Sequence, residues 1–106
     1  ETLKSPIGVV DSDYVFRKAN AEFLRWIGRS EADVHGREMV DVVGKGLFDQ
    51  IYRPLVDRAL GGERIKEKVT LDFAEHPATS CSVRCLPHFD VAGSVDAVII
   101  DIHSLE

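Results

Sequence analysis

The chain has 106 residues, of which 44% are hydrophobic and 29% charged. This balance is typical of a folded globular domain and excludes a disordered chain or a collagen-like repeat. The longest apolar runs fall far short of the ~20 residues that a membrane-spanning helix needs, so we expect no membrane contact by this domain. The net charge of −5, with both signs mixed along the chain, argues against nucleic acid as its partner.

The N-terminal part of the chain predicts a β-hairpin followed by a helix. Residues 7–11 and 14–17 are typical of two strands, with turn-forming residues at 11–13. Asn20 stands directly before a run with helical spacing, where its side chain can cap the first backbone N–H groups. Gly28 ends this helix in the usual C-terminal way.

The middle of the chain predicts several short helices. A single turn opens at Ser30 and ends at Gly36, and a second short helix spans residues 38–43. The longest helical pattern covers residues 47–60 and contains Pro54. Because proline removes a helix hydrogen bond and restricts the residue before it, we expect either a kink or two short helices, with Pro54 in the first turn of the second.

The C-terminal part changes to a period of two and predicts three antiparallel strands. Residues 65–73 form a strand with one solvated side, His76 and Pro77 break it, and residues 79–89 form the next strand. Residues 95–102 are apolar on both sides, which indicates a central strand covered on both faces. The order of the elements predicts an α+β domain, with one sheet and helices grouped over one of its faces.

Two cysteines, Cys81 and Cys85, lie four residues apart on one predicted strand. Their Cα atoms would be roughly 13 Å apart, whereas a disulfide needs less than about 7 Å. We therefore expect free, buried thiols and a reducing, cytoplasmic location.

The sequence shows no signature of catalysis or of metal binding. The four histidines lack metal-ligand spacing with one another or with the cysteines; they are His35, His76, His88 and His103. No local signature of a catalytic triad is present, and Gly44-Lys45-Gly46 lacks the pattern of a phosphate-binding loop. We therefore expect no enzymatic activity in this domain.

Several short motifs, in chain order and at suitable spacing, resemble those of the PAS domain family. They are Pro6-Ile7-Gly8-Val9-Val10-Asp11, Lys18-Ala19-Asn20-Ala21-Glu22-Phe23, Ile27-Gly28-Arg29-Ser30 with Asp33 and Gly36, Ala59-Leu60-Gly61-Gly62-Glu63, and Leu86-Pro87 with Asp90, Gly93 and Asp101-Ile102. The resemblance implies a five-stranded antiparallel sheet in the order 2-1-5-4-3, with several short helices on one face. It implies a single domain over residues 1–106 with its core at about 5–102, and residues 103–106 as an exit linker or cloning remnant.

The resemblance also implies a non-catalytic sensory or dimerisation module of a larger signalling protein. The output domain of that parent protein could belong to a histidine kinase, a cyclic-dinucleotide enzyme or a transcription regulator. The family's light-sensing members carry a cysteine in an Asn-Cys-Arg context on a middle helix, and its haem-sensing members carry a histidine on the long helix. Neither is present here, so we expect no haem or covalent flavin. The family's common Asp-Ile-Thr ending is replaced by Asp101-Ile102-His103.

A small organic ligand would, on the resembled fold, lie between the helices and the inner face of the sheet. The candidate lining residues are Phe23, Val42, Phe48, Ile51, Tyr52, Leu55, Glu67, Val69, Leu71, Cys81 and Val83. Tyr52 is interpreted as a core residue with its hydroxyl at the rim, or as a hydrogen-bond donor to the ligand. Glu67 is either an edge charge or a group that faces the ligand.

The expected structural residues are Asn20, Gly28, Gly36, Gly62, Pro87, Gly93 and Asp101. A second apolar side of the last strand predicts a homodimer formed through the sheet. The alternative is a small stand-alone enzyme of the hot-dog or cone-shaped isomerase type, which would have one long uninterrupted helix and a catalytic carboxylate in an apolar cavity.

Overall fold

The computed structural model describes residues 5–73 and 76–106, except for the side chains of Phe73 and His76. The first elements are β1 (Ile7–Asp11), β2 (Phe16–Ala19), α1 (Ala21–Ile27), a 3₁₀ turn (Glu31–Asp33), α2 (Met39–Val43), α3 (Lys45–Leu47), a π-helical turn (Phe48–Tyr52) and α4 (Arg53–Leu60). Three long strands follow: β3 (Ile65–Phe73), β4 (His76–Phe89) and β5 (Val95–Ser104).

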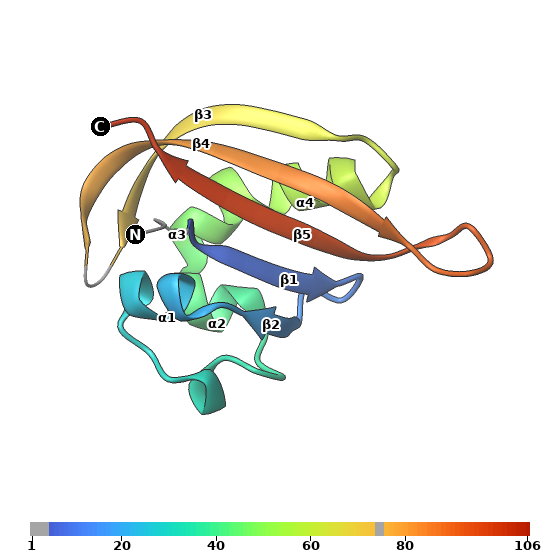
Figure 1. Ribbon diagram of the computed structural model, residues 1–106, viewed down its shortest axis with the longest axis horizontal. Coiled ribbons are helices and arrows are strands. Elements are labelled where there is room, and N and C mark those ends of the chain that lie inside the picture. Colours follow the sequence, from blue (N-terminus) through green and yellow to red (C-terminus); the bar gives the residue numbers. More distant parts are fainter. Residues whose placement is uncertain (1–4, 74–75) are drawn as a thin grey trace.

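The strands form one antiparallel sheet in the order β2-β1-β5-β4-β3. This order confirms the predicted topology. The helices are grouped on one side of the sheet, with α4 behind β3–β5 (Figure 1). β5 lies in the middle of the sheet, because it pairs with β1 on one edge and with β4 on the other. The last strand therefore connects the N-terminal hairpin to the C-terminal strands.

One face of the sheet forms the core, and the other is only partly covered. On β5, Val98, Ile100 and Ile102 are fully buried beneath the helices. Ala97 and Ile99 alternate with them and are half-buried on the opposite face. The expectation that this strand is covered on both faces is therefore wrong for the single chain, because every helix packs on the same side.

Local signals in the sequence explain where α1 begins and ends. The Asn20 side chain accepts a hydrogen bond of 2.9 Å from the backbone N–H of Phe23, as an N-cap residue does. Gly28 follows the helix with φ 69° and ψ 35°, a left-handed conformation that glycine adopts without steric penalty.

The segment around Pro54 is helical throughout but changes its pitch. A π-helical turn spans Phe48–Tyr52, and α4 starts at Arg53 with Pro54 in its first turn. Pro54 has no N–H to donate, so the preceding turn lacks one ordinary i→i−4 hydrogen bond. The helix widens into a π-helical turn there and does not end. This matches the predicted interruption and places Phe48 and Tyr52 in the core.

Four strand boundaries differ from the prediction. β2 ends at Ala19 instead of Arg17, and β5 ends at Ser104 instead of Ile102, so residues 103 and 104 continue the strand. The other two differences are the starts of β2 and β4. β2 starts at Phe16 instead of Tyr14, because the Asp11 carboxylate accepts the backbone N–H groups of Asp13 (2.8 Å) and Val15 (3.1 Å) and so prolongs the turn. Within this turn Tyr14 has a positive φ of 61°.

β4 starts at His76 instead of Thr79, so the proline at position 77 does not break it. Pairing with β5 begins only at Cys81, so Pro77 lies in a stretch bordered by β3 alone. A strand tolerates proline where one side has no ladder to complete.

Candidate functional site

The space between the helices and the inner face of the sheet collects most of the predicted lining residues. Eight of the eleven are buried there: Phe23, Val42, Phe48, Tyr52, Leu55, Leu71, Cys81 and Val83. They come from α1, α2, the π-helical turn, α4, β3 and β4. The sequence pattern thus predicted residues that share one apolar core.

Tyr52 provides the most unusual polar group of this interior. Its side chain is completely buried, and its hydroxyl has no hydrogen-bond partner among the residues that the structure describes. The expectation of a hydroxyl at the rim is therefore wrong. Burial raises the pKa of Tyr52 far above its usual value, with the nearby thiols of Cys81 and Cys85 acting in the same direction. The phenol is a neutral donor and acceptor with unused hydrogen-bonding capacity in an apolar space.

The two cysteines lie on the same inner face of β4 and are both free and buried. The Cys81 thiol donates to the backbone carbonyl of Thr79 at 3.4 Å. Burial raises the pKa of Cys85 to about 12, and it also raises the pKa of Cys81. Both groups stay protonated near neutral pH, which favours a packing role over a nucleophilic one. Among the described residues, no group of three or more His, Cys, Asp or Glu side chains could hold a metal ion.

Glu67 is not part of the interior. It is exposed on the edge strand β3, where its carboxylate is 3.4 Å from the Arg58 guanidinium of α4. Its placement in the candidate pocket is therefore wrong. The alternative interpretation, that Glu67 is a charge on the edge of the sheet, is correct. The apolar neighbours along the strand gave a misleading signal, because β3 is the edge of the sheet and the Glu67 carboxylate can reach both solvent and Arg58 there.

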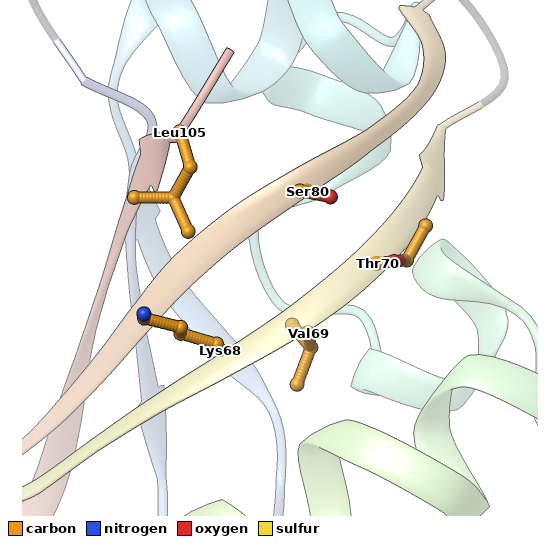
Figure 2. A pocket seen from close by; sticks show the side chains of 5 residues that line it. All are labelled: Lys68, Val69, Thr70, Ser80 and Leu105. Atoms are coloured by element: carbon orange, nitrogen blue, oxygen red, sulfur yellow. The ribbon is translucent and has the colours of Figure 1, made fainter.

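Ile51 and Val69 lie at the margin of the core, where both are half-buried. Val69 also lines an open hollow at the β3–β4 edge, together with Lys68, Thr70, Ser80 and Leu105. Figure 2 shows Val69 pointing toward the helices and Lys68 extending over β4 below Leu105. The alternation of sides along β3 therefore separates an interior surface from a polar outer one.

A polar cluster on the outer face of the sheet is centred on Asp101. This residue is only 7% exposed and accepts hydrogen bonds from Ser5 Oγ at 2.9 Å and from Arg84 Nη2, with His103 Nε2 at 3.3 Å. Burial alone would raise its pKa, but the bonds from Arg84 and Ser5 hold the pKa of Asp101 below its usual value. The cluster ties the start of the chain to β5. Sequence analysis named Asp101 but missed its partners, which only strand pairing brings together.

Within the described part of the chain, no helix is long and apolar enough to cross a membrane.

Comparison with solved structures shows which proteins share this fold. The PAS domain of BvgS from Bordetella pertussis matches 96% of this chain and 77% of its own, with a TM-score of 0.81 and 20% identity. A sensory box sensor histidine kinase from Vibrio cholerae matches 97% of this chain and 82% of its own, with a TM-score of 0.83 and 15% identity. VqmA of Vibrio cholerae, in a complex with ligand and DNA, matches 98% of this chain and 47% of its own, with a TM-score of 0.86 and 18% identity.

No curated protein sequence matches the chain significantly. The family described as the PAS fold, however, matches residues 1–104, which is nearly the whole chain. The sheet order, the short helices on one face and this match agree with one another. The chain belongs to the PAS-fold family.

Proposed function

We propose that this domain is a non-catalytic sensory and dimerisation module of a signal-transduction protein. The family and the similar structures, which include a sensor histidine kinase and the regulator VqmA, support this proposal. A sensor of this kind works by binding a signal more tightly in one of two conformations. The conformational change would be transmitted to the output domain through β5, the central strand that ends at Ser104.

The observation that carries the ligand-binding part of the proposal is the buried hydroxyl of Tyr52, which bonds to no other described residue. A hydroxyl left without a partner in an apolar interior costs about 1–3 kcal/mol. A small organic molecule with one polar group, seated among Phe48, Leu55 and Leu71, would satisfy it and be oriented by it. One polar contact in a mostly apolar space is the usual composition of a small-molecule site.

Native mass spectrometry of the purified domain tests this proposal directly. We expect a small organic molecule of definite mass to remain bound to the wild-type protein, without haem or covalent flavin. The Tyr52→Phe variant keeps the ring and removes only the hydroxyl, so it should fold while retaining about tenfold less ligand. Tyr14→Phe is the matched control, because the hydroxyl of Tyr14 bonds to Asp57 at the surface. Equal occupancy in the wild type and in Tyr52→Phe would contradict the role of Tyr52.

The dimerisation part of the proposal rests on the outer face of the sheet. Val9, Leu86, Ala97 and Ile99 are half-buried there and belong to three adjacent strands. Contiguous apolar surface of this kind typically marks an interface. A second copy related by two-fold symmetry would cover it.

The stand-alone enzyme is the less supported alternative. It would need one long helix, whereas α4 has eight residues and follows a π-helical turn. It would also need a catalytic carboxylate in an apolar cavity, whereas Glu67 is exposed and paired with Arg58.

A further inference from the structure

The outer face of β3, β4 and β5 carries a group of cationic side chains around a hollow. The hollow is lined by Lys66, Lys68, Ser82, Arg84, His103 and Leu105. Strand register brings these residues together, since Lys66 lies opposite Arg84, Lys68 opposite Ser82, and Ser82 opposite His103. Residues directly opposed in this way have Cβ atoms only about 4.5–5.5 Å apart. We call this group of six residues the basic hollow.

The positive charge of the basic hollow is only partly neutralised by the protein. Asp101 pairs with Arg84 and lies 3.3 Å from His103. Neither Lys66 nor Lys68 has an ion-pair partner among the described residues. Like charges placed opposite each other on a sheet are destabilising, and the chain as a whole carries a net charge of −5. Asp101 supplies a counter-charge to Arg84, and the Glu106 carboxylate accepts the backbone N–H of Ser80 nearby. Neither carboxylate forms an ion pair with Lys66 or Lys68, so the charge of these two lysines is free to attract an anion.

Unused hydrogen-bonding groups lie in the same hollow. Ser82 is only 5% exposed, and within residues 5–73 and 76–106 its hydroxyl has no hydrogen-bond partner. The Nε of Arg84 is likewise buried without a partner in this part of the chain. A serine hydroxyl and a guanidinium N–H are both donors, and ammonium groups are donors only. The groups that remain free in the basic hollow are thus complementary to an acceptor that carries negative charge.

We propose that the basic hollow binds an oxyanion, the phosphoryl or carboxylate group of a small molecule. The Ser82 hydroxyl and the Lys68 ammonium donate to its oxygens, and Lys66 and Arg84 supply further positive charge. Leu105 follows the end of β5, lies above Lys68 in the view of Figure 2, and borders the hollow. This site lies on the opposite face of the sheet from Tyr52, so it does not depend on the interior ligand proposed above.

An NMR titration of the purified domain with inorganic phosphate tests the proposal, with total ionic strength held constant by sodium chloride. We expect saturable shifts of the backbone amides of Lys68, Ser82 and His103. Ser82→Ala and Lys68→Gln should each weaken binding about tenfold, since each removes one donor to a charged acceptor. Ser82→Ala removes a hydroxyl that bonds to none of the described residues, so the fold should be retained. Unchanged amide shifts of core residues would show this.

Matched control variants distinguish a specific anion-binding site from nonspecific screening of surface charge. Lys18→Gln removes the same charge from the exposed part of β2, and Ser94→Ala removes a hydroxyl from the turn before β5; both should bind phosphate like the wild type. A parallel titration with succinate identifies the source of the oxyanion, because the anion that saturates at lower concentration reveals a phosphoryl or a carboxylate ligand. Shifts that stay linear with both anions would overturn the proposal. It would also fail if Lys18→Gln weakened binding as much as Lys68→Gln, or if Ser82→Ala bound like the wild type.

Discussion

The side-chain amide of Asn20 bonds to three backbone groups in two segments of the chain. Its Oδ1 accepts the N–H of Ile7 at 3.0 Å and that of Phe23 at 2.9 Å, and its Nδ2 donates to the carbonyl of Ser5 at 2.8 Å. The residue therefore caps α1 and also fixes the start of β1 against it. Sequence analysis predicted only the cap, because the contacts with Ser5 and Ile7 span more than a dozen positions of the chain.

Replacing Asn20 should reveal both of its contributions. We expect Asn20→Ala to lower the free energy of unfolding by about 2 kcal/mol, at the upper end of the range for a lost N-cap. Asn20→Asp keeps the oxygen that caps α1 but loses the donor to Ser5, so its effect should be intermediate. Urea denaturation followed by circular dichroism measures both variants. An unchanged midpoint for Asn20→Ala would show that the three hydrogen bonds do not contribute to stability.

Asp101 makes the stability of the domain depend on pH in a definite direction. Its pKa is lower in the folded state than in the unfolded chain, because Arg84 and Ser5 donate to its carboxylate. The stabilisation is therefore fully present above the ordinary carboxyl pKa of about 4 and is lost as the pH falls through the lowered, folded-state value.

The Asp101→Asn variant tests this linkage. At pH 7 it should lower the free energy of unfolding by about 1–3 kcal/mol, the usual penalty for disrupting a buried, charged hydrogen-bond network. The difference between variant and wild type should shrink as the pH falls below about 4. Thermal unfolding across this pH range gives the result, and a difference that stays constant down to pH 2 would contradict the assignment.

Two glycines in the helical part of the chain differ in how much their positions need glycine: Gly28 follows α1, and Gly46 lies within α3. Gly28 has a φ of 69°, which other residues adopt only with strain. Gly46 lies within α3, and open space surrounds the position where a Cβ would be added. The two glycines therefore form a matched pair, in which the same substitution should act in opposite directions.

We expect Gly28→Ala to lower the free energy of unfolding by about 1 kcal/mol, because alanine is strained in the left-handed region. Gly46→Ala should raise it by up to about 1 kcal/mol, since alanine loses less conformational entropy than glycine in a helix. Differential scanning calorimetry of both variants provides the comparison. The interpretation fails if the two melting temperatures shift in the same direction.

At the scale of the whole molecule, the two sides of β5 have different surroundings, although their sequences are similarly apolar. Val98 is fully buried beneath the helices, and its neighbour Ile99 is half-buried on the outer face. Val98→Glu places an unpaired charge in the core and should unfold the domain. Ile99→Glu should leave the fold intact and convert a dimer into a monomer.

Light scattering coupled to size-exclusion chromatography measures the mass of the wild type and of Ile99→Glu, and circular dichroism reports whether each variant is folded. A wild-type domain that is monomeric at high micromolar concentration would contradict the proposed dimer. The same conclusion would follow if Ile99→Glu remained dimeric.

The local chemistry of the sequence was sufficient for the order of the elements and for eight of the eleven residues expected between the helices and the sheet. The period-two pattern located β3, and a stretch that is apolar on both sides located β5. Asn20 and Gly28 delimited α1, and Pro54 indicated the interruption before α4. These signals act over a few residues, through backbone conformation and short-range hydrogen bonds, so they can be read along the chain. The sheet order was predicted from the resemblance to a family, since periodicity alone does not specify which strands pair.

Tertiary structure decided the features that depend on neighbours distant in sequence. Glu67 has apolar neighbours along β3, yet it is exposed and pairs with Arg58, because the sheet order places β3 at an edge. Tyr52 is fully enclosed because the π-helical turn directs it between the helices and β4. Lys68, Ser82 and His103 meet only because three antiparallel strands align in one register. Burial and electrostatic environment arise from contacts across the fold, so the sequence supplies the groups and the packing determines which of them remain without a partner.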